Sequence, residues 1–421
     1  MTSIFKTVSN LNDDDIDKIL RKLFLCFLFL VFVTTSINSF IGFYTHDPWL
    51  IGDWLINYQG GMIRRGLLGE LFYKLSQLTR VNPGVFVFLF QTLFYGVFFL
   101  FSYLLLKRQR SLLPYVLLIF SPFIFTFQIF DFEGGYRKEV IYFSILAFVV
   151  FSAASYDYQK FKKTFYAVLL IYPALILAHE MLAIYLPYLL VVFVFASKLE
   201  KREVTAVILL LIPSVVVFCL SLYFSGTTSQ AAEIVDSLAK AGYAISGGAI
   251  HWIDKPASYA IEILVPIINE NHYYFYYPQV LVLSAIAYIP LRKRFEYIFK
   301  NNLSRILILV SLIGSVALFI FAADWGRFLY IHLVSLFLLS LLLSGRRNIR
   351  DDVKSAIPSI NPFDRGKARI CLLIIVFILY SQFWHVPHCC TPNPYALKYT
   401  QINAVKFAKP YVRIVRRVFK Q

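Results

Sequence analysis

Residues 23–43 read LFLCFLFLVFVTTSINSFIGF, and this stretch decides the fold class of the chain. It carries no charged side chain, and about 20 apolar residues are what a helix needs to cross a ~30 Å hydrocarbon core. The basic residues Lys18, Arg21 and Lys22 precede it, which predicts that residues 1–22 lie in the cytoplasm.

Similar apolar stretches recur along the whole chain. Hydrophobic residues make up 59% and charged residues 15%, against roughly 45–50% and 25% in soluble domains. We therefore predict an all-α, polytopic integral membrane helical bundle of about eleven transmembrane helices, with juxtamembrane amphipathic helices. The predicted spans are 23–43, 84–106, 111–130, 140–156, 164–178, 181–197, 204–224, 274–291, 304–322, 328–344 and 370–385.

Successive spans place the loops alternately on the two sides of the membrane. The basic residues support this topology, because each even-numbered span ends in a basic cluster, on the cytoplasmic side. The net charge of +17 then reflects topology, and no nucleic-acid partner is expected. The predicted transmembrane domain covers 23–385. Its external loops are 44–83, 131–139 and 225–273.

The basic C-terminal tail, 386–421, does not fit this count simply, because eleven spans place it outside. Within it, residues 411–420 have the pattern of a basic amphipathic helix lying on anionic lipid. Either this helix lies on the outer leaflet or the number of spans differs by one.

The first external loop contains the densest polar stretch, DWLINYQGGMIRRGLLGE (53–70). Its glycines allow a ligand to approach the backbone closely, and paired arginines match phosphate oxygens. This favours a site for a phosphate-bearing, membrane-borne substrate; the alternative is arginines that bind lipid headgroups. The candidate substrate-binding residues here are Asn57, Tyr58, Gly60, Gly61, Arg64 and Arg65.

Three further polar motifs fall on the same predicted side. They contain Glu133, Arg137, Lys138 and Glu139; His179 and Glu180; and Asp324 and Arg327. Ionisable groups at membrane depth cost about 2.5–3.5 kcal/mol each on insertion scales, so they usually face a cavity and serve a site. We expect the motifs to converge, although acid–base pairs that close helix ends are the alternative.

Residues 67–78 place leucines on one face, with Glu70 and Lys74 opposite. This pattern predicts an amphipathic helix lying flat on the outer surface. The five cysteines show no metal-ligand spacing, and the adjacent Cys389 and Cys390 receive no role.

A carboxylate in the first external loop, followed by a juxtamembrane helix, resembles the GT-C class of membrane glycosyltransferases and the related O-antigen (Wzy-type) polymerases of bacterial polysaccharide assembly. The resemblance covers the layout of roughly the first 200 residues. It implies an acidic catalytic residue, matched by Asp53 or Asp47, and charged residues at the start of span 4. Asp53 is preferred because Asp47 precedes Pro48, a pattern typical of a turn. His179 and Glu180 would complete the catalytic site.

The resemblance also implies a multi-pass protein of the bacterial inner membrane, whose N-terminus the basic residues before the first span place in the cytoplasm. It would use sugars linked to polyprenyl phosphate or diphosphate at the periplasmic face, in contact with membrane lipid and polysaccharide assembly proteins. The sequence does not decide whether a divalent metal is bound, because Asp47 and Asp53 are six residues apart and form no Asp-x-Asp pair. The rival function is a transporter or flippase of lipid-linked oligosaccharide, which would carry charges within its spans and show inverted repeats.

Overall fold

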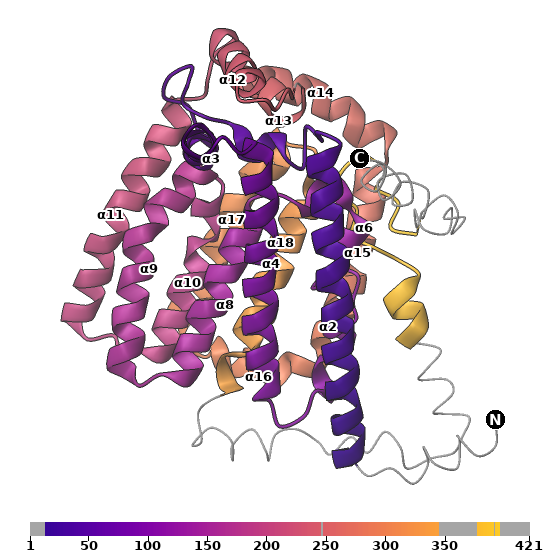
Figure 1. Ribbon diagram of the computed structural model, residues 1–421. Helices are drawn as coiled ribbons and strands as arrows, with labels where there is room; N and C mark the ends of the chain where they lie inside the picture. Colours follow the sequence, from indigo (N-terminus) through magenta and orange to yellow (C-terminus); the bar gives the residue numbers. More distant parts are fainter. Residues whose placement is uncertain (1–12, 246, 345–376, 391, 396–421) are drawn as a thin grey trace.

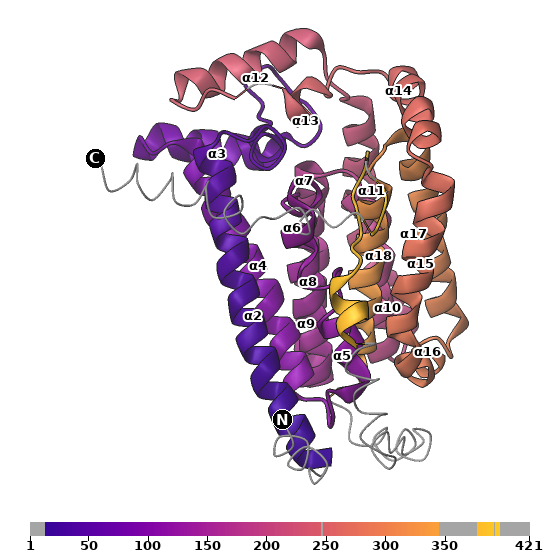
Figure 2. The ribbon, with the colours of Figure 1, turned by 90° about the vertical axis from the view of Figure 1, so that its right-hand side faces the viewer.

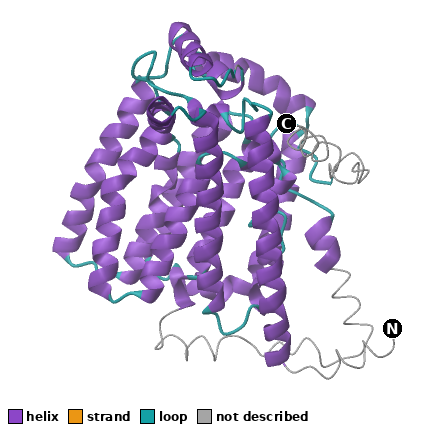
Figure 3. Ribbon diagram, in the orientation of Figure 1, coloured by secondary structure: helices purple, strands orange, loops and turns teal. Residues whose placement is uncertain are grey.

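Helices and the loops between them form the structure. The computed structural model describes residues 13–245, 247–344, 377–390 and 392–395, and these residues form helices and no strand (Figure 3). The all-α fold class is therefore confirmed.

Within those ranges, six helices are long and apolar enough to cross a membrane. One of them, α15 (Tyr273–Tyr288), continues through a short 3-10 turn, η3 (Ile289–Leu291), into α16 (Arg292–Ile298). The chain thus has the character of a multi-pass membrane protein (Figure 1). The six are α2 (Asp13–Tyr44), α4 (Pro83–Lys107), α9 (Tyr158–Ala178), α11 (Lys201–Tyr223), α17 (Asn302–Phe321) and α15 (Tyr273–Tyr288) with α16.

Three shorter apolar helices form the centre of the bundle: α8 (Glu139–Ser155), α10 (Leu182–Ala196) and α18 (Trp325–Ser340). Most of their side chains are buried, as expected for helices that are apolar all round. At 1.5 Å per residue they are about 23–26 Å long, less than a ~30 Å hydrocarbon core. Their short length leaves room for buried loops at the bundle end where all three begin.

The predicted span 111–130 differs from expectation, because it is not one helix. It is divided into η2 (Leu113–Tyr115), α5 (Val116–Ile119) and α6 (Phe127–Phe130). Pro114 and Pro122 lie in this segment, and proline has no backbone N–H to donate within a continuing helix. Irregular backbone is tolerated at membrane depth where protein surrounds it.

This irregular segment still runs lengthwise beside α2. Near its start, Arg21 donates a hydrogen bond to the carbonyl of Gln109 over 2.7 Å. Near its end, Gln128 donates to the hydroxyl of Thr35 over 2.9 Å. Arg21 and Thr35 are about 21 Å apart along an α-helix. The segment therefore follows α2 through most of the bundle.

The loops predicted to be external form a layer at one end of the bundle. This layer contains α3 (Gly66–Thr79), α12 (Thr228–Lys240), α13 (Gly248–His251) and α14 (Ala257–Glu270), whereas α16 lies at the opposite end (Figure 1). Helix α3 runs across the bundle axis (Figure 2), and Lys74 Nζ lies 3.5 Å from Glu70 Oε1 on it. The amphipathic helix predicted after Arg65 is therefore present.

Several predictions lie wholly or partly outside the described residues. They concern the first part of the N-terminus (1–12), the start of the span 370–385 and the tail helix 411–420. Residues 377–382 of that last span are helical.

Candidate active site

The first loop is built into the bundle and does not lie on its surface. Asp53 belongs to a short 3-10 helix, η1 (Gly52–Leu55), whose residues are all buried. The indole of Trp54 donates a hydrogen bond to the carbonyl of Tyr136 over 2.8 Å, and Gln91 donates to the carbonyl of Leu50 over 2.8 Å. These bonds hold the loop above the short central helices.

Asp53 is 1% exposed, and neither of its carboxylate oxygens has a hydrogen-bond partner among the described residues. A buried carboxylate without partners is costly unless nearby charges favour its ionised form. Burial raises the pKa of Asp53, but the positive charges of Lys138, Arg137 and Arg65 outweigh burial, so the pKa lies below its ordinary value. Asp53 is therefore ionised and unpaired.

Arg65 connects the first loop to the α9–α10 connection. Its Nη2 lies 2.6 Å from Oε1 of Glu180, and its Nε lies 2.9 Å from Oε2. Arg64 is more distant, with Nη1 3.9 Å from Oε1 of the same carboxylate. Burial opposes ionisation of Glu180, but the two arginines outweigh it and lower the pKa to about 2.

His179 precedes Glu180 and is fully buried, and its Nδ1 lies 3.6 Å from Oε2 of Glu180. Burial and the charge of Arg65 lower the pKa of His179 well below its ordinary value. The imidazole is therefore neutral at physiological pH.

The loop before α8 contributes two buried cations. Lys138 is fully buried, and its ammonium donates to the carbonyl of Arg65 over 3.1 Å. Burial lowers the pKa of Lys138 to about 8, although Asp53 favours the charged form. Arg137 donates from Nε to the carbonyl of Glu133 over 3.1 Å, and its guanidinium lies 4.8 Å from the ring centroid of Trp49.

The turn before α18 completes the group. Arg327 Nε lies 2.9 Å from Oε1 of Glu139, and its Nη1 lies 2.5 Å from Oδ2 of Asp324. The four predicted motifs therefore meet at one end of the central helices. We refer to their shared residues as the Asp53 cluster: Asp53, Arg64, Arg65, Arg137, Lys138, Glu139, His179, Glu180, Asp324 and Arg327.

The charge balance of the Asp53 cluster favours an anion over a cation. Five basic side chains face four carboxylates, and His179 is neutral. Arg64 and Arg65 have side chains 25% and 27% exposed, so they form its accessible edge. Because cations surround the one free carboxylate, Asp53, the cluster does not fit a divalent metal ion.

Other predicted site residues lie outside the Asp53 cluster. Oδ1 of Asp47 accepts the backbone N–H groups of Trp49 and Leu50, each over 2.9 Å, so Asp47 closes a turn. Glu133 is largely exposed, with its side chain 56% accessible.

The contacts of residues 57–61 are to α12, which covers the first loop, and to α3. Asn57 donates to the hydroxyl of Ser237 over 3.1 Å. Tyr58 donates its backbone N–H to Glu70 over 3.0 Å. Gly60 and Gly61 pack against Gln230. These predicted substrate-binding residues therefore attach the first loop to α12 and α3.

The sequence did not predict a second pair, Asp131 and His388, because 257 residues separate them. Nδ1 of His388 lies 2.7 Å from Oδ2 of Asp131. The only local signal was a histidine beside two cysteines in a segment with no assigned role.

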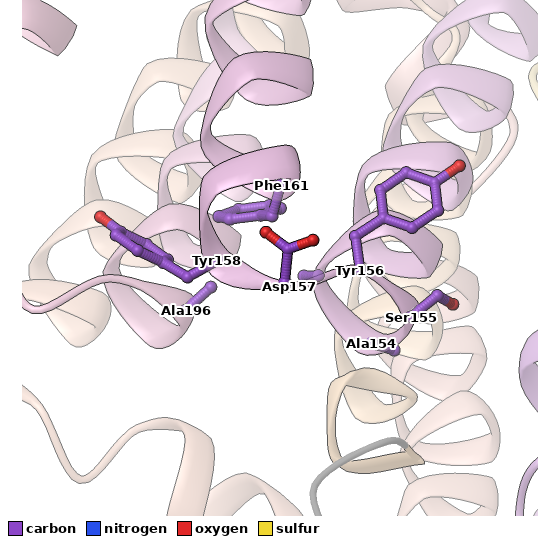
Figure 4. A pocket seen from close by; sticks show the side chains of 8 residues that line it. Ala154, Ser155, Tyr156, Asp157, Tyr158, Phe161 and Ala196 are labelled. Atoms are coloured by element: carbon purple, nitrogen blue, oxygen red, sulfur yellow. The ribbon is translucent and has the colours of Figure 1, made fainter.

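One pocket lies away from the Asp53 cluster. It has a volume of about 350 Å³ and is lined by the connection between α8 and α9 (Figure 4). Figure 1 shows this connection at the end of the bundle opposite to α3. Its one acidic side chain, Asp157, accepts the backbone N–H of Lys160 over 3.0 Å and caps α9. This pocket therefore offers no chemistry comparable to that of the Asp53 cluster.

Comparison with protein-family models, with curated proteins and with solved structures finds no match for this chain.

Proposed function

We propose that this chain is a membrane glycosyltransferase or polysaccharide polymerase, similar to the GT-C class. It would use sugars linked to polyprenyl phosphate or diphosphate at the periplasmic face of a bacterial inner membrane, through about eleven spans and with its N-terminus in the cytoplasm. The observation that carries the proposal is Asp53, an ionised and unpaired carboxylate buried among cations.

Such a carboxylate suits a general base that accepts the proton of an acceptor hydroxyl as the glycosidic bond forms. The surrounding cations weaken it as a base in the empty site, because they stabilise its ionised form. A bound phosphate would neutralise part of their charge and raise the pKa of Asp53. The base would therefore become stronger only once the donor is bound.

The accessible edge of the Asp53 cluster suits the phosphate of the carrier. Arg64 and Arg65 have planar guanidinium groups, which match phosphate oxygens in pairs. They would also stabilise the charge that develops on the departing phosphate. Lys138 lies behind them and adds positive charge without reaching the surface.

A transporter of lipid-linked oligosaccharide is the second candidate, because Asp53 is closed off from solvent as in an occluded binding site. A deletion strain distinguishes the two functions. Loss of a transferase leaves carrier-linked sugar on the outer leaflet, where an impermeant lectin binds it in spheroplasts. Loss of a transporter leaves the same sugar on the inner leaflet, hidden from the lectin. Unchanged surface glycan in the deletion strain would contradict both functions.

A further inference from the structure

A second group of side chains lies where the segment 384–390 packs against the bundle end that holds the Asp53 cluster. This segment contains His388, Cys389 and Cys390, which have no part in the proposed function. The backbone N–H of His388 donates to Oδ2 of Asp131 over 2.6 Å, and its carbonyl accepts from Gly326 N over 3.2 Å. A Cβ at position 134 would collide with His388, so Gly134 leaves the space in which His388 lies.

The side chain of His388 is oriented by a carboxylate. Its Nδ1 lies 2.6 Å from Oδ1 and 2.7 Å from Oδ2 of Asp131. This contact places the ring proton on Nδ1 and leaves the lone pair of Nε2 free to bind a ligand. A carboxylate behind a histidine is the usual support of a metal-ligating imidazole.

His388 is one of three possible metal ligands of different chemistry that lie close together. A carboxylate oxygen of Asp324, a ring nitrogen of His388 and Sγ of Cys389 all lie within 4.8 Å of one another. Donor atoms around a tetrahedral zinc ion are roughly 3.3–3.8 Å apart, given bonds of about 2.0–2.3 Å. A small inward movement of the side chains would therefore close the set around an ion.

The charge around His388 also suits a cation. The carboxylates of Asp131, Glu133 and Asp324 surround it, and Glu133 Oε2 lies 3.7 Å from Nε2. Of the nearest cations, Arg327 is paired with Glu139 and with Oδ2 of Asp324, which leaves Oδ1 of Asp324 for the ion, and Arg137 stacks on an aromatic ring. This balance is opposite to that of the Asp53 cluster.

We propose that the reduced chain binds one zinc-like divalent ion through His388 Nε2, the Cys389 thiolate and Asp324, with Asp131 as a positioning residue. In the structure, Cys389 is joined to Cys390 by a disulfide, which occupies the sulfur. A dithiol reductant supplies two electrons and two protons, converts both cysteines to thiols and itself becomes a disulfide. The metal ion then displaces the proton of Cys389. Metal binding and the disulfide are therefore mutually exclusive.

The site would make the contact between the segment that contains His388 and the loop 131–139 dependent on the redox state of Cys389 and Cys390. That loop also carries Arg137 and Lys138 of the Asp53 cluster. The proposal does not depend on the glycosyltransferase function, because it concerns binding of an ion by a group that shares only Asp324 with the Asp53 cluster.

The test uses the full chain in nanodiscs, with Co²⁺ as a spectroscopic probe. After reduction with a phosphine, titration should give a thiolate-to-cobalt absorption band that saturates at roughly one ion per chain and is displaced by Zn²⁺. The untreated, disulfide-bonded chain should give no band. His388→Ala and Cys389→Ser should abolish the band, and Asp131→Asn should weaken affinity by about 10–100-fold.

Cys219→Ser is the matched control, because Cys219 is free, exposed and on α11, and it should bind Co²⁺ as the unchanged chain does. Thermal unfolding without metal checks that Cys389→Ser and Cys219→Ser are equally folded. If Cys389→Ser is unstable, Asp324→Asn provides the second ligand variant. The proposal is overturned if the reduced chain gives no band, or if the ligand variants bind Co²⁺ as tightly as the unchanged chain.

Discussion

Arg65 binds Glu180 through two nitrogen atoms, Nη2 at 2.6 Å and Nε at 2.9 Å, although 115 positions separate the two residues. Arg65 precedes α3, and Glu180 lies between α9 and α10. This pair connects the first loop to the central helices and gives the guanidinium of Arg65 a carboxylate partner other than Asp53. Asp53 consequently keeps a free carboxylate, held ionised by charges that it does not contact directly.

Asp53→Asn should reduce glycan extension by about 10²–10⁴-fold, the typical cost of losing a general base. The amide keeps the shape of the side chain but cannot accept the proton. The measurement is turnover of lipid-linked donor by membranes that contain equal amounts of correctly inserted protein. Activity within a few-fold of the unchanged chain would remove Asp53 from the mechanism.

Asp47→Asn is the matched control for that variant. Asp47 accepts two backbone N–H groups through Oδ1, and the amide oxygen of asparagine can accept the same bonds. Its turnover should therefore remain within a few-fold of the unchanged chain. A large loss with Asp47→Asn, together with normal activity of Asp53→Asn, would transfer the role to Asp47.

Arg65→Lys should lower both stability and turnover more than Arg64→Lys does. Lysine cannot reproduce the two-nitrogen contact with Glu180, and hydrogen bonds to charged groups contribute about 1.5–3 kcal/mol. Arg64 reaches the same carboxylate only at 3.9 Å, so its replacement should have a smaller effect. Unfolding in detergent mixtures measures the difference, and equal effects at both positions would show that Arg65 only contributes charge.

Gly69→Ala should disrupt the packing of α3 against the first loop and so destabilise the protein. A Cβ at this position would overlap the carbonyl oxygen of Ile56, and both backbones are fixed there. Gly96→Ala is the control, since its Cβ would lie 3.3 Å from the ring of Phe32, a side chain that can shift. We expect a lower melting temperature for Gly69→Ala alone. Equal melting temperatures would mean that α3 is not held by this contact.

The sequence predicted the elements of the fold more reliably than their continuity. Apolar length identified α2, α4 and α17 because each helix carries its own hydrophobic signal. Residues 111–130 have the same composition, but protein surrounds them, so their prolines are tolerated without a continuous helix. Composition alone does not reveal which apolar segments are enclosed in this way.

The candidate site shows the same division. Ionisable residues in apolar surroundings identified Asp53, Glu180 and Arg327, because burying such groups is costly without partners. Their pairing did not follow from the sequence, since long-range contacts depend on how the helices are arranged. His388 was missed for this reason. Its partner Asp131 lies in the loop before α8, and no local pattern connects them.

Reporter fusions can test on which side of the membrane each end of the helical bundle lies. Fusions after Arg110, Lys163, Arg202 and Arg294 should report the cytoplasm, because basic residues collect on that side of a membrane protein. Helix α4 ends, and α9 and α11 begin, at the end of the bundle that holds α16 (Figure 1). Fusions near Gly60, Gly134 and Gly247 should report the outside. A fusion after Arg347 tests the same alternation in a segment outside the described residues. Opposite locations for Gly60 and Gly134 would be incompatible with the Asp53 cluster.

Lys138 should set the alkaline limit of activity. Burial lowers its pKa from 10.5 to about 8, so the ammonium charge is lost as the pH rises through about 8. The unfolded chain holds this proton more tightly, so between about pH 8 and 10.5 the contribution of Lys138 to stability increases with pH. Loss of activity in this range would therefore not come from unfolding through Lys138. Glu180, with a pKa of about 2, stays ionised throughout.

Turnover should therefore fall above about pH 8 while the melting temperature does not fall with it, because the positive charge behind the phosphate site disappears. Lys138→Arg keeps the charge at all these pH values and should move the alkaline limb upward, even if its maximum rate is lower. The measurement is a pH–rate profile of both proteins, with thermal unfolding at each pH. A limb that stays at the same pH in Lys138→Arg would assign it to another group and leave Lys138 with a structural role, as the donor to the carbonyl of Arg65.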